Sequence, residues 1–410
     1  MRNICIVVLI LTGLGFGAWE SIGPYGGYVR SMAVSHTNDN IAYVASNNYP
    51  AIVAKTTDGG ATWNNMGSLD YTYGYSMAID PTNHNKVYVG GSHRLYYTTN
   101  GGTNWTLVTM SNRYIMGLVV DNSNPAIIYG SCYAYDGSRW RMACLKSTNS
   151  GSTWNTFFLH DSTGYGYCVA LDPSNTNNVY VGGYVYANAT YAPTAYKSTN
   201  GGASWTQMTT GVPTTGYYVY SMAVHPTNTN IVYMGTYTAG IYRSTDAGNS
   251  WTQVSTHYYN YGMTTSAADP NITYSGGYSD VYKTTDAGAT WFSVSIGLAG
   301  YYYYALYASQ QNASRVYAGN NRGVYKTING GTSWLNSTNN LNMGPIAGFS
   351  TAPSQGSVLY TSFEEIGVFK STNCGTNWAL LPTPVACGNI CQFAVDYTNP
   401  NILYGLEGSG

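Results

Sequence analysis

The sequence predicts an all-β fold: a β-propeller of about eight four-stranded blades, with an incomplete ninth blade that the two chain ends could share. Three observations predict it. One hairpin motif occurs eight times, at intervals of 40 to 51 residues. A second strand–turn–strand pattern lies between the copies, so each repeat supplies four antiparallel strands. The composition favours strands and turns, because Tyr and Gly number 43 and 48 while charged residues make up 8% of the 410 residues.

The hairpin motif is Ser/Thr-x-Asp/Asn-x-Gly-x-x-Trp, as in TTDGGATW at 56–63. Each conserved position of the repeat suits a tight turn. The Asp or Asn oxygen accepts backbone N–H groups, the Gly adopts positive φ, and the Trp enters the next strand as a large apolar side chain. The turn residue and the Trp of the eight copies are Asp58 and Trp63, Asn100 and Trp105, Asn149 and Trp154, Asn200 and Trp205, Asp246 and Trp251, Asp286 and Trp291, Asn329 and Trp334, and Asn373 and Trp378.

The acidic turn position is interpreted as structural rather than catalytic. Only Asp58, Asp246 and Asp286 are acidic, and Asn takes the same place in the other copies. Asn caps a turn but carries no charge, whereas catalysis or calcium binding would require the carboxylate. The eight hairpins are therefore expected to stabilise the fold.

The pattern between the hairpins, such as SMAIDPTNHNKVYVGG at 76–91, reads as strand, Asn/Pro turn, strand. Four strands in 40 to 50 residues match one propeller blade and exceed one coil of a β-helix. Labelled a to d in chain order, such strands place the a–b and c–d turns on one face of the disc. We call it the box face, because the motif hairpins are c–d turns. The b–c and d–a loops lie on the opposite face.

Tyrosines crowd the d–a connections, and we call the face that they occupy the tyrosine face. Aromatic rings beside few charges and many hydroxyls suit a neutral, hydroxylated ligand such as a glycan, or the surface of a protein partner. Single tyrosines could instead pack between blades, and the charged b–c loops could simply be solvated. The candidate ligand-binding residues are Tyr73, Tyr167, Tyr218, Tyr259, Tyr302, Arg139, Trp140 and Arg141.

The hairpin motif resembles the Asp-box, or BNR, repeat over nearly all of the chain after residue 18. Among Asp-box propellers, the chain is most similar to xyloglucanase-type glycoside hydrolases, photosystem assembly factors and sortilin-like receptors. The resemblance implies a propeller whose ligand site lies opposite the boxes. Xyloglucanases carry a catalytic Asp in the first b–c loop, where this sequence has Ser46 to Tyr49, and Arg30 stands where sialidases place the first of three arginines.

Binding is therefore the leading hypothesis for function. A divergent glycoside hydrolase, xyloglucanase-like or sialidase-like, is one alternative, although a glycosidase needs two carboxylates that the sequence does not place. Glu364 and Glu365 are the adjacent carboxylates late in the chain. A self-assembling extracellular structural protein is the other alternative, because a surface poor in charge resists self-association weakly.

Residues 1–18 read as a signal peptide, which leaves a single propeller over 19–410 that is secreted or displayed at the cell surface, without a membrane span after cleavage. The net charge of −1 and the absence of basic runs argue against nucleic acid. The scattered histidines predict no metal site, and no cofactor is expected.

Export also makes disulfides plausible. Cys132 with Cys144 could close one long loop, and two among Cys374, Cys387 and Cys391 could pair. With Cys168, these six cysteines allow 15 connectivities, among which the sequence does not choose.

Overall fold

The structure is a computed structural model that describes residues 27–187, 189–215, 218–338, 346–352, 354–355, 357–363, 367–375, 377–381, 390–396 and 399–407. All regular elements in these ranges are strands, and none of the described residues forms a helix that could cross a membrane. The predicted all-β propeller class is confirmed. The signal peptide expected at 1–18 lies outside the described residues, as do Glu364 and Glu365.

Seven four-stranded blades follow one another, each pairing antiparallel in chain order. The strands of the first three are β1 (Val29–Val34), β2 (Ala42–Ser46), β3 (Ala51–Thr56) and β4 (Asn64–Leu69); β5 (Ser76–Asp80), β6 (Asn83–Gly90), β7 (Ser92–Thr98) and β8 (Thr106–Val120); and β8 with β9 (Ile128–Tyr135), β10 (Trp140–Ser147) and β11 (Asn155–Leu171).

The strands of the next four are β11 with β12 (Val179–Ala187), β13 (Thr190–Ser198) and β14 (Thr206–Met208); β15 (Val219–Val224), β16 (Val232–Thr236), β17 (Ile241–Ser244) and β18 (Thr252–Ser255); β19 (Gly262–Thr265), β20 (Thr273–Gly276), β21 (Val281–Thr284) and β22 (Phe292–Ser293); and β23 (Ala305–Ala308), β24 (Val316–Asn320), β25 (Gly323–Thr327) and β26 (Leu335–Asn336). The long strands β8 and β11 each serve two blades. In β8, the first part pairs with β7 as an outer strand and the second part pairs with β9 as an inner strand.

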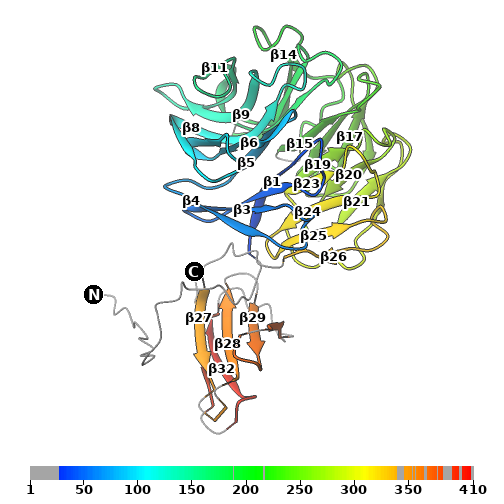
Figure 1. Cartoon of the computed structure of the whole chain (residues 1–410). Coiled ribbons are helices and arrows are strands. Elements are labelled where there is room, and N and C mark those ends of the chain that lie inside the picture. The colour runs from blue at the N-terminus through cyan, green and yellow to red at the C-terminus, as the bar shows by residue number, and fades with distance from the viewer. Residues whose placement is uncertain are drawn as a thin grey trace.

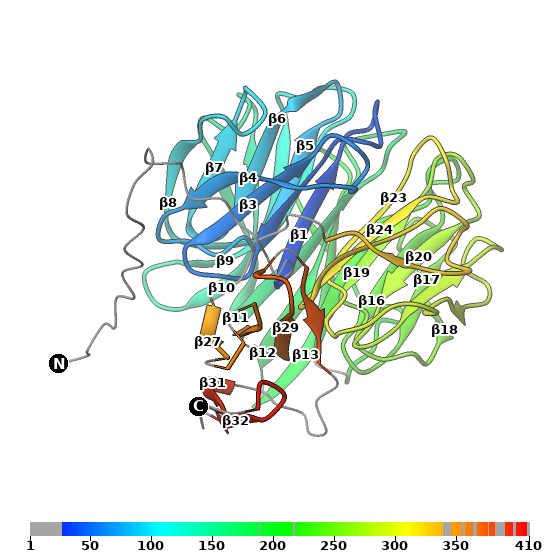
Figure 2. The same ribbon diagram turned by 60° about the horizontal axis from the view of Figure 1, so that its bottom comes forward.

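The seven blades form a closed ring (Figure 1). The inner strands β1, β5, β8, β11, β15, β19 and β23 pack side by side in this order, and β23 packs against β1. Figure 2 shows the same ring turned by 60°. The ring therefore closes after seven of the repeats, whereas the sequence predicted about eight blades.

The remaining strands lie beside the ring (Figure 1). They are β27 (Ile346–Thr351), β28 (Leu359–Phe363), β29 (Gly367–Ser371) and β30 (Ala379–Leu380), which form a four-stranded sheet, and β31 (Ile390–Val395) and β32 (Leu403–Glu407), which pair with each other. β27 packs against β31, as inner strands of successive blades do. The pair β31–β32 is the ninth repeat of strands a and b. Its sharing with the first residues of the chain, and a single propeller over 19–410, stay predictions.

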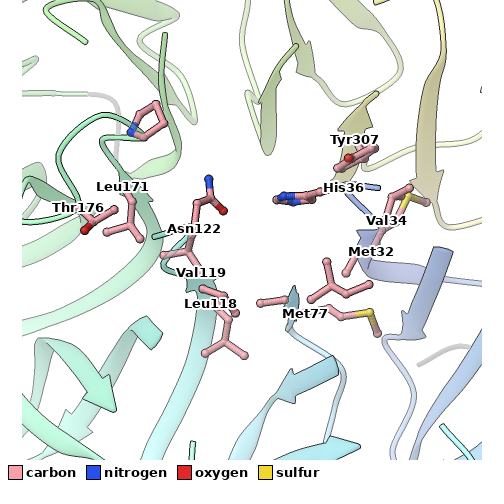
Figure 3. A pocket seen from close by; sticks show the side chains of 15 residues that line it. Met32, Val34, His36, Met77, Leu118, Val119, Asn122, Leu171, Thr176 and Tyr307 are labelled. Carbon is pink, nitrogen blue, oxygen red and sulfur yellow. The ribbon is translucent and has the colours of Figure 1, made fainter. Parts of the chain in front are cut away.

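The inner strands enclose a channel with a cavity at each end. One cavity, of about 230 Å³, opens on the tyrosine face, and the other, of about 240 Å³, opens on the box face (Figure 3). Met32, Met77 and Leu118 line both cavities, so the two cavities adjoin at these apolar side chains.

Buried tyrosines in the second strand link neighbouring blades in six of the seven blades of the ring, the exception being Tyr233 in the fifth. The hydroxyl of Tyr43 donates to the carbonyl of His84 at 3.1 Å, and that of Tyr129 donates to the carbonyl of Gly201 at 3.1 Å. The lysine before a box makes the same crossing, since Lys146 Nζ donates to the Gly201 carbonyl at 2.6 Å. The equivalent tyrosines are Tyr88, Tyr180, Tyr274 and Tyr317. These tyrosines thus have a structural role.

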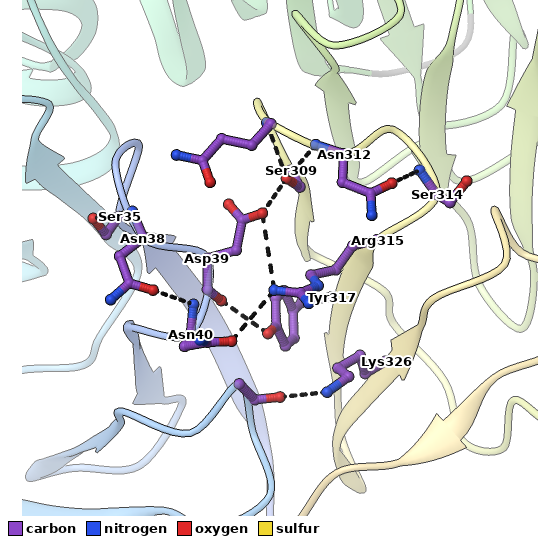
Figure 4. A network of polar contacts seen from close by, with 12 residues as sticks. Ser35, Asn38, Asp39, Asn40, Ser309, Asn312, Ser314, Arg315, Tyr317 and Lys326 are labelled. Carbon is purple, nitrogen blue, oxygen red and sulfur yellow. Dashed lines mark hydrogen bonds and ion pairs between the residues drawn. The ribbon is translucent and has the colours of Figure 1, made fainter.

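The same contacts close the ring between its last and first blades (Figure 4). Tyr317 donates to the carbonyl of Asp39 at 3.0 Å, and Lys326 Nζ donates to the carbonyl of Gly59 at 2.7 Å. The carboxylate of Asp39 accepts a hydrogen bond from Ser309. The described strands of the first and last blades come from opposite ends of the ring sequence, so side-chain and packing contacts hold these two blades together. We call this junction the seam of the ring.

The boxes and the a–b turns lie on one face, as the blade topology requires. Gly59 N–H donates to the carbonyl of Asn40 at 3.0 Å, and the bond recurs in the other blades. Asp58 and Asn149 make equivalent contacts, because the Oδ1 of each accepts the backbone N–H four residues later at 2.9 Å. This geometry supports a structural role for the turn position.

The disulfide expected between Cys132 and Cys144 is wrong, since both thiols are free and buried. The two residues lie on adjacent strands of a hairpin, where Cys132 faces Ala143 and Cys144 faces Ser131. Side chains one position apart in register point to opposite faces of a sheet, so these two sulfurs cannot meet. Cys168 and Cys374 are also free, and the side chains of Cys387 and Cys391 lie outside the described residues.

Candidate functional site: the tyrosine-lined channel mouth

Toward the tyrosine face, each inner strand of the ring has one residue at an equivalent position. In four blades the ladder skips this residue, which forms a β-bulge. A bulged residue lacks a partner across the ladder and its side chain is re-aimed, a device that is common beside functional sites. The residues of this register are Arg30, Tyr75, Met116, Tyr167, Tyr220, Tyr261 and Tyr304. All except Met116 line the cavity at the channel mouth.

The rings of this register touch around the mouth. Ring centroids lie 4.7 Å apart for Tyr167 and Tyr220, 5.3 Å apart for Tyr220 and Tyr261, and 4.4 Å apart for Tyr261 and Tyr304. Burial raises the pKa of Tyr167, Tyr220 and Tyr261 well above the ordinary value of a phenol. These phenols therefore stay neutral, and each hydroxyl can donate or accept a hydrogen bond.

Arg30 is the charged residue of the channel mouth. Its guanidinium carbon lies 3.6 Å from the centroid of the Tyr304 ring, in a cation–π arrangement. Among the described residues it forms no ion pair. Arg30 therefore offers hydrogen-bond donors to a ligand in the channel mouth.

A second tier of rings extends outward over the third and fourth blades. Tyr114, Tyr133 and Tyr165 form a continuous stack, with centroid distances of 4.4 Å and 4.0 Å. Trp140 meets this stack edge-on, 5.3 Å from Tyr114. Tyr184 links the stack to the mouth, since it lies 5.1 Å from Tyr165 and contacts the predicted Tyr218 and Tyr167. The rings form one surface from the rim to the channel.

The sixth and seventh blades present their tyrosines on matching turns. Tyr259 and Tyr302 have positive φ values of 61° and 63°, which side-chain-bearing residues rarely adopt. A backbone hydrogen bond holds each turn, from Tyr259 N–H to the carbonyl of Tyr237 and from Tyr302 N–H to that of Tyr278. Strained backbone of this kind is found preferentially at functional sites. In the run 301–304 the side chains point both ways, because Tyr303 is fully buried whereas Tyr301 is exposed.

Charged side chains of the b–c hairpin in the third blade pair with neighbouring groups of the protein. Arg141 contacts Asp136 at 3.2 Å and Asp161 at 2.7 Å, and its Nε donates to the carbonyl of His160. Hydrogen bonds from the backbone N–H of Arg139 and from Ser138 hold the pKa of Asp136 far below its usual range. Arg141 is thus engaged within the protein, whereas Arg139 is exposed.

The structure brings all eight predicted ligand-binding residues to one face. Tyr167 and Tyr218 touch directly, at 5.6 Å, while Tyr73 contacts Tyr49 and stacks on the mouth residue Tyr75. Sequence reasoning missed Arg30 as a mouth residue, and also the tyrosines in or just after the second strand. Of these, Tyr237 and Tyr278 follow β16 and β20, whereas Tyr133 and Tyr184 occupy the equivalent positions inside the longer strands β9 and β12. Their signal was a Tyr that repeatedly follows one or more small residues in or just after this strand.

Comparisons with known proteins show the fold. No family model and no curated protein matches the chain. Among solved structures, a GH74 xyloglucanase from Xanthomonas campestris superposes with a TM-score of 0.68 at 13% identity, over 93% of this chain and 71% of that one. An ancestral GH74 enzyme gives 0.72 at 18% identity, over 97% of this chain and 60% of its own length. YCF48 bound to D1 peptide gives 0.53 at 14% identity, over 77% and 96%.

Proposed function

We propose that this chain is an extracellular binding protein that holds a glycan on its tyrosine face. The observation that carries the proposal is the continuous aromatic surface that runs from Trp140 through Tyr184 and Tyr218 into the channel mouth. Aromatic faces bury the apolar C–H face of a sugar ring, and neutral phenol hydroxyls bond to sugar hydroxyls. Arg30 adds the charged donor at the centre.

The charges of the face support binding rather than hydrolysis. A glycosidase needs one carboxyl group with a raised pKa as general acid beside a second carboxylate. On this face, the carboxylates of Asp136 and Asp161 both form ion pairs with Arg141, which bridges them. The pKa of Asp136 is lowered, first by the backbone N–H of Arg139, so it remains ionised. A divergent glycoside hydrolase is the second candidate, and this acid pair would be its site.

The test is a glycan array probed with the full chain, followed by incubation of every bound polysaccharide with the protein. Binding without release of reducing ends is the expected result. The double variant Tyr167→Ala with Tyr218→Ala should lose the array signal, and the control Asn83→Ala, in a box-face turn, should keep it. Hydrolysis that Asp136→Asn abolishes would establish the second candidate. No array signal, with capture of an extracellular protein that the double variant fails to capture, would replace the glycan by a protein ligand.

A further inference from the structure

The side chain that follows the Trp of the box differs between two groups of blades in the ring. In the first five blades it is polar, and the residues are Asn64, Thr106, Asn155, Thr206 and Thr252. In the sixth and seventh blades it is Phe292 and Leu335, each opposite the lysine that precedes the box of its blade. All seven side chains are exposed, so packing inside the ring does not account for the two large apolar residues.

Two further exposed apolar residues lie in the same blades. Ile328 occupies the second position of the seventh box, where the other seven boxes all have Thr, and Ile296, in the turn after β22, is 73% exposed. We call Phe292, Ile296, Ile328 and Leu335 the rim patch. Seven large apolar side chains other than Tyr are exposed among the described residues, and four of them belong to this patch. Clustering of this kind, at positions where a repeat departs from its own pattern, indicates a functional surface.

Direct contacts between the two blades make the rim patch continuous. The backbone N–H of Trp334 donates to the carbonyl of Ile296 at 2.9 Å, which places Ile296 beside the strand that begins at Leu335. The indole N–H of Trp334 donates to the carbonyl of Val294 at 2.5 Å, two residues from Phe292. The strand of Leu335, β26, is the outermost strand of its blade and lies at the outer edge of the ring (Figure 1), where another molecule can reach it.

The rim patch carries no charge of its own. Residues 292–297 and 327–337 contain no Asp, Glu, Lys or Arg. The lysines opposite the two outer strands, Lys283 and Lys326, each donate to a backbone carbonyl of the next blade. An ionic partner therefore finds no charge to pair with here. Outer strands that expose apolar side chains without charged neighbours are prone to associate with another molecule.

A second copy of this chain is the partner that fits these properties. The net charge is −1 and charged residues make up 8% of the chain, so electrostatic repulsion between copies is weak. A two-fold axis would place the same patch on both sides of the contact, so that uncharged apolar side chains meet their own kind. The exposed parts of four such side chains amount to on the order of a few hundred Å², which suits a weak, reversible dimer and is too little for a permanent one.

We propose that the rim patch is the contact surface of a weak two-fold dimer of this chain. Phe292 and Leu335 begin their strands directly after the boxes, so the contact lies toward the box face. The tyrosine faces of both copies stay accessible in this arrangement. The dimer therefore does not depend on the proposed glycan binding.

The test is sedimentation velocity of the full chain at a series of micromolar concentrations, with a reductant because Cys374 is exposed and could form an intermolecular disulfide. The weight-average sedimentation coefficient should rise with concentration and level off at the dimer value. High salt should not weaken the association, because the contact is apolar. The double variant Phe292→Thr with Leu335→Thr restores a residue that the other blades use, and should raise the dissociation constant of the dimer about tenfold or more.

Leu107→Thr is the matched control, because Leu107 is also an exposed apolar residue but lies on β8 in the second blade. It should dimerise as the original chain does. If the double variant does not fold, Ile328→Thr takes its place, restores the residue of the other boxes and should weaken the dimer severalfold. A chain that stays monomeric at every concentration overturns the proposal, as does growth beyond the dimer or equal association of the original chain and the patch variants.

Discussion

Asp and Asn are interchangeable at the turn position of the boxes because the turn uses an oxygen acceptor rather than a charge. In Asn149 the second oxygen is replaced by Nδ2, which donates to Thr153 at 2.8 Å, whereas Oδ2 of Asp246 accepts from Ser250 at 2.5 Å. The neighbouring hydroxyl reverses its role between the two cases. The sequence predicted this equivalence from the mixture of Asp and Asn alone.

The charged copies should nevertheless respond to acid. The hydrogen bond from Ser250, with that from Ser244, lowers the pKa of Asp246 from 3.8 to about 2. A lowered folded-state pKa adds stability that is fully present above pH 3.8 and is lost as the pH falls through about 2. The triple variant Asp58→Asn, Asp246→Asn and Asp286→Asn should match the original chain at pH 7 and lose less stability between pH 4 and pH 2.

Urea unfolding at a series of pH values measures this difference. Other aspartates with lowered pKa, such as Asp121, remain in the triple variant and keep part of the acid response. A triple variant that is strongly destabilised at pH 7 would show that the boxes require the charge.

At the scale of elements, the sequence predicted the four strands of a blade and the face on which each turn lies. It did not predict the bulge at Arg30, Tyr167 and Tyr220, because the same strand pattern is compatible with paired and bulged residues. Nor did it separate the tyrosines that link blades from those that reach the surface. That distinction depends on register, and a shift of one residue reverses which face a side chain occupies.

The inter-blade tyrosines should matter for stability and not for ligand binding. Tyr317→Phe removes the donor to the Asp39 carbonyl at the seam of the ring and should lower the free energy of unfolding by about 0.5–1.5 kcal/mol. Tyr258→Phe is the control, because 57% of this side chain is exposed on the tyrosine face. Chemical denaturation of both variants tests the contrast, and equal stability for the two would refute the structural role of the seam.

At the scale of the whole molecule, the sequence predicted a propeller but not where the ring closes. Each repeat carries the same box, so the motif alone does not mark the last blade of the ring. Closure depends on the fit at the seam. A Cβ at Gly319 would lie 2.5 Å from Val29 Cγ1, so the close approach of the last blade to the first requires this glycine. Such complementarity between residues nearly 300 positions apart is visible only in three dimensions.

The low charge of the molecule predicts that its binding depends little on salt concentration. Arg30 is the charged residue among those that line the channel mouth, so screening by salt has little to act on. We expect the dissociation constant for the glycan to change by about twofold or less between 50 and 500 mM NaCl. Surface plasmon resonance at the two salt concentrations measures it, and a loss of affinity of about tenfold or more would point to an ionic ligand site.

The most direct test of the glycan-binding account is a calorimetric titration of the strongest glycan from the array into Tyr218→Ala, Tyr218→Phe and Asn83→Ala. The account predicts that Tyr218→Ala weakens binding about 30-fold, which corresponds to about 2 kcal/mol for an aromatic hot spot. Tyr218→Phe, which keeps the ring, should retain most of the affinity, and Asn83→Ala should bind as the original chain does. Full affinity in Tyr218→Ala together with loss in Asn83→Ala would contradict it, because the ligand would then lie on the box face.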